Sequence, residues 1–294
     1  MIRYLPETEN AMDSILVATD FSDDARNAAV RAGMLAREQG LAKGVLLHVL
    51  PPIPLEVELE LRATAALERA METLAAEIAA ASGFALEPRI ASGSVVNTLA
   101  DAADGFSLVA LGARGVHPLR DLAIGSSAER LVRKCRRPVL IVKARPQAPY
   151  RRVIVPVDFS PDSGAALALA HALAPEAGLT LVHAYEVPFE GKLGLAGAST
   201  EDIERYRSQA RAQADGRMTE MLAAAGLGRG GAARVLARAY TPQLIHDTAA
   251  AAGADLIAIG KHGSSMAEEL LLGSVTLHTL AAADCDVLVV PGQR

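Results

Sequence analysis

Two stretches of glycine and serine have the residue types and the spacing of an anion-binding loop. The first covers 112–127 and reads GARGVHPLRDLAIGSS, and the second covers 260–274 and reads GKHGSSMAEELLLGS. In each, two residues separate the first two glycines, nine separate the second from the third, and a serine follows. Glycine lets the backbone approach a ligand closely, and free N–H groups at the start of a helix attract anions. The chemistry that these stretches predict is the binding of phosphate.

Each glycine stretch follows a short apolar run that is typical of a buried strand. The first is preceded by SLVAL at 107–111, and its last residues lead into a helical pattern from about Ser126 to Cys135. Similar apolar runs occur earlier and later in the first half, with helical patterns between them. The predicted strands are 14–18, 45–50, 86–92, 107–111 and 139–144, and the helices between them include 56–81 and 95–104. This alternation predicts an α/β fold with right-handed parallel crossovers and helices on both faces of the sheet.

The second half of the chain repeats the first. RVIVPVDFS at 152–160 matches DSILVATDFS, DLIAIG at 255–260 matches SLVALG, and DVLVVPG at 286–292 matches PVLIVKA. We therefore expect two tandem domains, 13–143 and 151–292, joined by the proline-containing linker 144–150. The glycine-rich insert at 188–200 is either a mobile flap or a tolerated loop, and we favour the loop.

Composition excludes several classes of protein. The chain has 294 residues, enough for two ordinary domains, and a formal charge of −5, which argues against nucleic acid as the main partner. No apolar run reaches the ~18–20 residues of a membrane span. The two cysteines and the absence of a basic, apolar leader favour a cytoplasmic protein that does not act at a membrane.

These residues carry a resemblance to the universal stress protein family, and the chain resembles a tandem two-domain member. The family's nucleotide signature is Gly, two residues, Gly, nine residues, Gly, then Ser or Thr. Gly112, Gly115, Gly125 and Ser126 satisfy it in the first half, and Gly260, Gly263, Gly273 and Ser274 satisfy it in the second. The resemblance implies a Rossmann-like, five-stranded, mostly parallel sheet in each domain, with ATP across the carboxyl ends of the strands. It also implies Mg²⁺ or Mn²⁺ held by the phosphates rather than by a protein metal site.

The resemblance also implies the nucleotide-binding positions. The base and ribose would lie near Ala18, Thr19, Asp20 and Val49. The ribose and phosphates would lie near Gly112, Arg114 and Gly115, and the phosphates would be held by Gly125, Ser126 and Ser127. The counterparts in the second half are Pro156, Val157, Asp158, Ala184, Gly260, His262, Gly263, Gly273, Ser274 and Val275. A carboxylate can accept from ribose hydroxyls, and arginine is a stronger partner for phosphate than histidine at neutral pH.

Some of these residues have a purely structural interpretation as well. Asp20 and Asp158 could be helix N-caps, with or without ligand contact. The histidines of the second strands, His48 and His183, lie in apolar runs and are expected to be packed and hydrogen-bonded. The basic cluster at 130–137 is expected to be a solvated helix end rather than a nucleic-acid surface.

The two halves also differ from each other. Gly93 precedes the third helix of the first half where the second half has Tyr240, and Pro138 precedes the last strand of the first half where the second has Asp286. These differences leave open whether both halves bind nucleotide. The last strands are apolar and are expected at sheet edges, where unpaired backbone groups invite pairing. The resemblance implies that single-domain relatives form dimers joined at this edge, so we expect the two halves to pair here as an intrachain pseudo-dimer. A homodimer of the whole chain is a further possibility.

No catalytic motif is present. The chain lacks GxxxxGK[ST], GxGxxG after its first strand, H-E-x-x-H, C-x-x-C and G-x-S-x-G. The leading hypothesis is an ATP-binding stress-response regulatory protein, a nucleotide-dependent switch or scaffold with an unidentified protein partner, and not a fast enzyme. The alternatives are a slow ATPase or autophosphorylating protein, and a nucleotide-free stress chaperone or scaffold.

Overall fold

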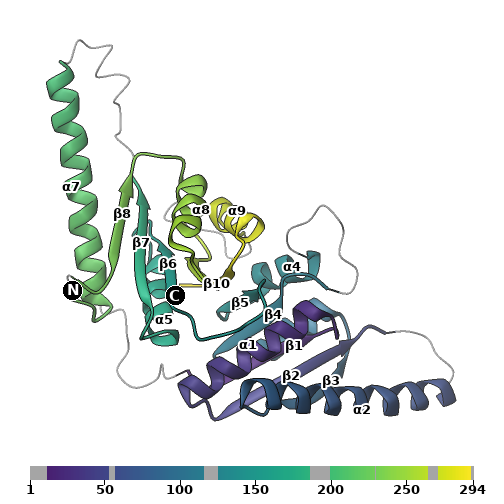
Figure 1. Ribbon diagram of the computed structural model, residues 1–294. Helices are drawn as coiled ribbons and strands as arrows, with labels where there is room; N and C mark the ends of the chain where they lie inside the picture. The colour runs from purple at the N-terminus through teal and green to yellow at the C-terminus, as the bar shows by residue number, and fades with distance from the viewer. Residues whose placement is uncertain are drawn as a thin grey trace.

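The computed structural model describes residues 12–52, 57–115, 125–185, 199–228, 230–263 and 271–292, with side chains for all of these except 57–63. The insert at 188–200 lies almost entirely outside the described residues. Within the described parts of the chain, no helix is both long enough and apolar enough to span a membrane. Figure 1 shows the strands of both halves joined in one sheet with helices on its two faces.

The first half contains five parallel strands, as the sequence predicts. Their order across the sheet is β3-β2-β1-β4-β5, and neighbouring strands are parallel throughout. The strands are β1 Ser14–Thr19, β2 Lys43–Leu50, β3 Glu87–Ser92, β4 Leu108–Gly112 and β5 Val139–Val142. The helices are α1 Asp23–Gln39, α2 Val57–Ser82, α3 Val95–Ala103 and α4 Ser126–Lys134.

The second half has the same order of strands, β8-β7-β6-β9-β10. Its strands are β6 Arg152–Pro156, β7 Gly178–Ala184, β8 Ala233–Ala237, β9 Leu256–Gly260 and β10 Asp286–Val290. Its helices are α5 Pro161–Leu173, α7 Thr200–Ala224, α8 Thr241–Ala252 and α9 Ser274–Ala282. The prediction of two tandem α/β domains is confirmed.

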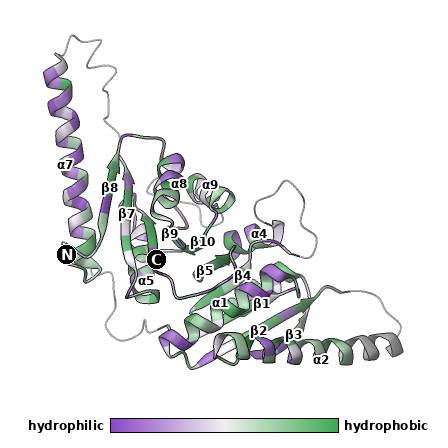
Figure 2. Cartoon of the chain, viewed as in Figure 1, coloured by the Kyte–Doolittle hydropathy of each residue, from purple (hydrophilic) through white to green (hydrophobic). Residues whose placement is uncertain are grey.

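The central strands of the sheet are buried on both faces because they are apolar at nearly every position, whereas the outer strands β3 and β8 are partly exposed. Ile15 and Val17 of β1 belong to the core beneath α1, α2, α5 and α7, whereas Leu16 belongs to the core beneath α3, α4 and α9. Figure 2 shows the central strands as hydrophobic and α7 as largely hydrophilic. Continuous burial of this kind is typical of a parallel sheet covered by helices on both sides.

The two halves meet where β5 and β10 pair antiparallel, which confirms the expected pairing of the last strands within the chain. Leu140 lies opposite Leu288, with Ile141 opposite Val287 and Val139 opposite Val289. All of these side chains are buried. The pairing removes two strand edges that would otherwise expose unpaired backbone groups.

Two lysines cross this junction in opposite directions. Lys143, just after β5, donates from Nζ to the carbonyls of Leu280 and Ala283 at the end of α9, over 2.7 and 2.5 Å. Lys261, just after β9, donates to the carbonyls of Arg133 and Cys135 at the end of α4, both over 2.8 Å. Each ammonium group satisfies carbonyls that a helix end leaves unpaired, at the end where the helix dipole favours positive charge. Each domain therefore supplies a lysine that caps the carboxyl end of a helix in the other domain.

Asp286 connects the second domain to the linker and to α1. Its carboxylate accepts from the backbone N–H of Lys143 at 2.9 Å and from the Tyr150 hydroxyl at 2.7 Å, and lies 3.4 Å from Nε of Arg31. The Arg31 guanidinium lies over the Tyr150 ring and donates to the Ala148 carbonyl at 2.7 Å. Asp286 is only 1% exposed, so this acid is an internal connection and not a surface charge.

The burial of Asp286 makes its contribution depend on pH. Burial raises the pKa of Asp286 above its usual 3.8, although hydrogen bonds from Tyr150 and the Lys143 backbone act in the opposite direction. When the pKa of a carboxyl is higher in the folded chain than in the unfolded chain, the protonated form stabilises the fold. This stabilisation is complete at pH values below the pKa of the unfolded chain, and it is lost as the pH rises through the pKa of the folded chain. Asp286→Asn cannot titrate, so its loss of stability relative to the natural chain should be larger at about pH 4 than at about pH 7. Urea unfolding at the two pH values measures this, and a loss that grows with pH contradicts it.

Candidate functional site

In both halves the strand order reverses between the first and fourth strands. The reversal lies between β1 and β4 in the first half and between β6 and β9 in the second. In open α/β sheets, ligands bind in the crevice outside the carboxyl ends of the strands at such a reversal. The glycine stretches follow β4 and β9, so the fold brings the sequence-predicted loops to this place in each half.

The turn after β1 is built around a serine cap. Ser22 is the N-cap of α1, and its hydroxyl accepts from the N–H of Ala25 at 3.2 Å. Asp20 Oδ1 accepts from the Ser22 N–H at 3.0 Å and from the Ser22 hydroxyl at 2.5 Å. Asp20 therefore orients the cap, and the expectation that Asp20 itself is the N-cap is wrong, because Ser22 is the residue next to the helix start.

The second half repeats this arrangement after β6. Ser160 is the N-cap of α5, and Asp158 Oδ1 accepts from the Ser160 N–H at 3.0 Å and hydroxyl at 2.6 Å. The same correction therefore applies to Asp158. Both aspartates are half-buried.

The phenylalanine between Asp and Ser has a left-handed backbone in both halves. The φ angle is +66° at Phe21 and +64° at Phe159, a region that bulky residues rarely adopt. The Phe21 ring lies 5.0 Å from the ring of His48 on β2, and the Phe159 ring lies 4.4 Å from that of His183 on β7. Strained backbone of this kind is concentrated at binding sites. Sequence reasoning missed it, and the only signal was the repeated Asp-Phe-Ser.

The two histidines are hydrogen-bonded within the fold, as predicted, and they also support these turns. Nδ1 of His48 donates to the Thr19 carbonyl at 2.8 Å, and Nδ1 of His183 donates to the Val157 carbonyl at 2.7 Å. Burial lowers the pKa of His183, so its ring is held neutral at neutral pH. Each histidine thus fixes the carboxyl end of the first strand of its domain.

The residues expected to wall the base lie at these strand ends. Val49 and Val157 are buried, Pro156 ends β6, and Ala18 and Ala184 are half-buried. Thr19 pairs with His48 across β1 and β2, which brings the ends of the two strands together. The crevice wall at this edge is therefore mostly apolar, with the aspartate and the backbone groups as its polar features.

Two of the first-half glycines are needed for close approach. A methyl group at Gly112 would lie 2.5 Å from the backbone carbon of Asp24, so β4 ends directly against the first turn of α1. A methyl group at Gly115 would lie 2.6 Å from Oδ2 of Asp20. The N–H of Gly125 donates to the Ala113 carbonyl at 2.7 Å and closes the base of the loop. The N–H of Gly273 closes the second loop on the Lys261 carbonyl at 3.1 Å.

The helices that follow the loops begin with a glycine N-cap. Gly125 and Gly273 provide no side chain to cap α4 and α9, so the first N–H groups of these helices are open to a ligand. Ser126 and Ser127 are exposed at the start of α4. In the second half, Ser274 is exposed and Val275 replaces the second hydroxyl. Such a helix start favours a phosphate group.

Arg114 and His262 are held by an acid that sequence reasoning missed. Arg114 donates from its backbone N–H and from Nε to Asp24 Oδ2, over 3.1 and 3.3 Å. His262 donates from its backbone N–H and Nδ1 to Asp162 Oδ2, both over 2.9 Å. The Arg114 side chain is 55% exposed, whereas that of His262 is 9% exposed. The available signal was the recurrence of Asp four residues after Asp20 and Asp158.

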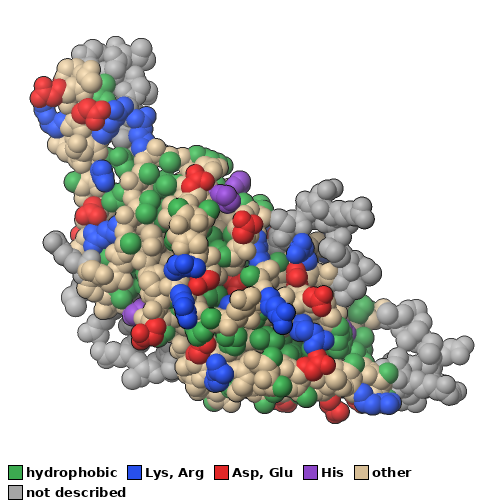
Figure 3. All heavy atoms as spheres, viewed as in Figure 1, with side chains coloured by type: hydrophobic (Ala, Val, Ile, Leu, Met, Phe, Trp, Pro, Cys, Tyr) green, Lys and Arg blue, Asp and Glu red, His purple; other side chains and the backbone are tan. Residues whose placement is uncertain are grey.

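The charged surface around α4 is locally paired. Arg133 pairs with Glu129 at 2.8 Å, Lys134 donates to Asn97 at 2.7 Å, and Arg137 donates to the Asp104 carbonyl at 2.8 Å. Figure 3 shows both signs of charge mixed over the visible face. Among the described residues, no group of three or more His, Cys, Asp or Glu side chains is placed to hold a metal ion.

Comparison with known proteins agrees with this architecture. The model of the universal stress protein family matches residues 12–143 and again residues 149–291. The chain belongs to the universal stress protein family, with two tandem domains. A universal stress protein of Mycolicibacterium smegmatis is 28% identical to this chain over 293 residues, which cover 94% of this chain and 96% of that protein.

Solved structures show the same tandem fold. A universal stress protein from Archaeoglobus fulgidus superposes with a TM-score of 0.70 at 20% identity, covering 95% of this chain and 98% of that chain. A protein from Pseudomonas aeruginosa UCBPP-PA14 superposes with a TM-score of 0.63 at 20% identity, covering 96% of this chain and 94% of that one. At these identities the superpositions establish the fold of this universal stress protein and not its ligand.

Proposed function

We propose that this universal stress protein binds ATP in the crevice at the carboxyl ends of its strands and acts as a nucleotide-dependent switch or scaffold in a stress response. The contact between Asp20 and Gly115 carries this proposal. It places a carboxylate directly beside a loop position that has no side chain, so a ligand can meet the carboxylate and the loop backbone at the same time. The exposed serines at the start of α4 lie at the other end of the same loop.

The first half fits a nucleotide at each of its parts. Asp20 can accept from ribose hydroxyls, the mostly apolar strand ends can hold the base, and Arg114 and the start of α4 can hold the phosphates. Only one edge of the Arg114 guanidinium is used by Asp24, and the side chain is 55% exposed. Bound phosphates would themselves supply ligands for Mg²⁺ or Mn²⁺, which suits a crevice whose described residues form no metal-binding cluster.

The second half fits less well, and we expect it to bind more weakly. The His262 side chain is turned into Asp162 and is 9% exposed, so it offers less to a phosphate than Arg114 does. Val275 lacks the hydroxyl that Ser127 provides. Each lost hydrogen bond to a charged group reduces affinity by about 1.5–3 kcal/mol, or roughly tenfold or more.

A binding role fits this chain better than fast catalysis, because sequence reasoning offers no group to activate the attacking water and no P-loop lysine. The domains proposed to bind are 13–143 and 151–292, and the proposed setting is the cytoplasm. An unidentified protein partner would read the nucleotide state, and dimerisation of the whole chain would add a second level of assembly.

The ligand and the stoichiometry test the proposal together. Mass spectrometry of ligand released from freshly purified protein should detect an adenine nucleotide, and calorimetric titration with ATP and Mg²⁺ should resolve one tighter and one weaker site per chain. Millimolar ATP should raise the melting temperature, since a ligand of the folded state stabilises it. Protein that carries no nucleotide and gains no thermal stability in millimolar ATP would instead be a nucleotide-free scaffold.

A further inference from the structure

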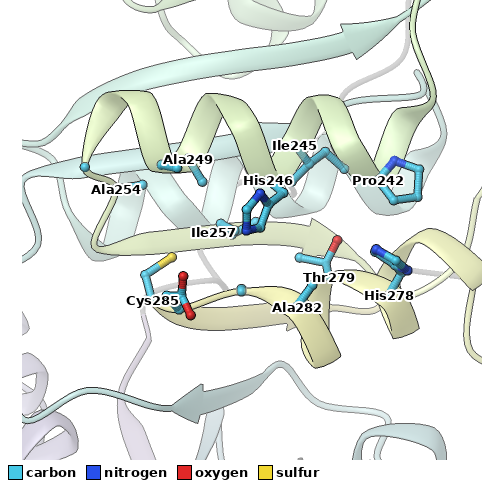
Figure 4. A pocket seen from close by; sticks show the side chains of 14 residues that line it. Pro242, Ile245, His246, Ala249, Ala254, Ile257, His278, Thr279, Ala282 and Cys285 are labelled. Atoms are coloured by element: carbon cyan, nitrogen blue, oxygen red, sulfur yellow. The ribbon is translucent and has the colours of Figure 1, made fainter. Parts of the chain in front are cut away.

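A cavity of about 220 Å³ lies between α8 and α9 in the second domain, away from the residues proposed for nucleotide. Figure 4 shows it between the two helices, with β9 behind it. Most of its lining is small and apolar. The full lining is Pro242, Ile245, His246, Ala249, Ala250, Gly253, Ala254, Ile257, His278, Thr279, Ala282, Ala283, Asp284 and Cys285.

The first domain fills the equivalent positions with large side chains. The halves align without gaps around the glycine stretches, so Phe106, six residues before Gly112, corresponds to Ala254, six residues before Gly260. Leu131 corresponds to Thr279 in the same way. Phe106 and Leu131 are 8% and 0% exposed and belong to the same core cluster. The second domain therefore lacks a phenyl ring and one methyl-sized group at the place where its cavity lies.

Thr279 adds a hydrogen-bonding group to this apolar space. The residue is 4% exposed, and among the described residues its hydroxyl has no hydrogen-bond partner. Figure 4 shows the Thr279 oxygen turned toward α8, across the cavity. Buried hydroxyls are normally paired, and one that is left unpaired destabilises the folded state. A rotation of the Thr279 side chain toward the open space would let a ligand with one polar group satisfy it.

The apolar majority of the lining favours an uncharged ligand, and its one carboxylate, Asp284, is exposed to solvent. Burial raises the pKa of the Cys285 thiol to about 12, so the thiol stays protonated and unreactive at neutral pH. His246 and His278 come from the facing helices, and the His278 ring contacts Tyr240, which is 70% exposed. Apolar cavities of about 150 Å³ bind benzene-sized molecules, so the space suffices for one aromatic ring.

We propose that this cavity is a binding site for a small, uncharged aromatic molecule with one hydroxyl or carbonyl group. The ring takes the space that the larger side chains of Phe106 and Leu131 fill in the first domain, and the polar group hydrogen-bonds to Thr279. The proposal is independent of nucleotide binding, because it uses none of the residues at the strand ends.

Phenol and benzene are suitable probes, titrated against the full chain by calorimetry and by ¹H–¹³C methyl NMR of the cavity alanines and isoleucines. Phenol should bind with one site per chain and shift the methyl resonances of Ile245 and Ile257. Thr279→Val keeps the shape but removes the hydroxyl, so phenol should bind roughly tenfold more weakly while benzene is unaffected.

Ala254→Phe restores the residue of the first domain and should abolish binding of both probes while raising the melting temperature. Gly105→Ala, in the other domain, is the control and should leave phenol binding unchanged, since its methyl group would lie no closer than 3.7 Å to another atom. The proposal is overturned if phenol does not bind the natural chain, or if Thr279→Val and Ala254→Phe bind phenol as the natural chain does.

Discussion

Replacing Asp286 with alanine is expected to lower the free energy of unfolding by about 3–5 kcal/mol. The alanine would leave the Arg31 charge buried without its carboxylate, and would remove the acceptor of the Tyr150 hydroxyl and the Lys143 N–H. Arg31 cannot lose its proton to relieve this, because guanidinium groups stay charged in proteins. The loss also falls on the junction between domains, so the linker and α1 should loosen together.

Urea unfolding followed by circular dichroism measures the loss, and hydrogen exchange locates it. Protection should fall first at β5, β10 and the linker 144–150. Asp284→Ala is the matched control, since Asp284 is exposed two residues away and should change stability by less than about 0.5 kcal/mol. Equal effects of the two substitutions would show that Asp286 does not connect the domains.

Replacing Gly115 with alanine should weaken ATP binding in the first half by roughly 10- to 100-fold. The new methyl group would lie 2.6 Å from Asp20 Oδ2, so the carboxylate must turn away from its present position. A side chain can make that adjustment cheaply, and the fold should therefore remain intact. The loss of one hydrogen bond to the charged carboxylate corresponds to about 1.5–3 kcal/mol, which gives the expected range.

Two other glycines provide controls for this measurement. Gly105→Ala places its methyl group no closer than 3.7 Å to another atom, outside the crevice, and should leave the calorimetric titration unchanged. At Gly263 the corresponding contact with Asp158 is 3.2 Å, so Gly263→Ala should affect only the weaker site, and by less. If Gly115→Ala binds ATP as the natural chain does, Asp20 has no part in the site.

The sequence was sufficient for the fold and for the location of the candidate site. Apolar runs with glycine stretches in the same register predict parallel strands and place both loops at the carboxyl edge, because the crossovers leave few other topologies. Five strands were expected in the second half, but the position of β8 Ala233–Ala237 was not predicted, because ARVLA is a short run interrupted by an arginine. The pairing of the last strands was expected from their apolar character together with the family resemblance, which implies dimers joined at this edge.

The details of the site could not be predicted because they depend on contacts distant in sequence. Asp24 holds Arg114 across 90 residues, and Lys261 reaches α4 across 126 residues or more. The left-handed backbone at Phe21 depends on packing against His48 from another strand. No local pattern specifies these contacts, and the cavity in the second domain depends on how α8 and α9 pack together.

The junction at Asp286 has a consequence for how such a chain can evolve. In a symmetric dimer of two identical subunits joined at their last strands, each interface residue is present twice. A carboxylate at the interface in one subunit is therefore accompanied by the same carboxylate in the other. Here the position equivalent to Asp286 is Pro138, and only one of the two halves carries the acid. Fusion of the two copies permits an asymmetric interface, in which one half supplies the carboxylate and the rest of the chain supplies its hydrogen-bonding and charged partners. Once this asymmetric interface exists, separating the halves into independent subunits would expose Arg31 and Tyr150 and remove their contacts with Asp286.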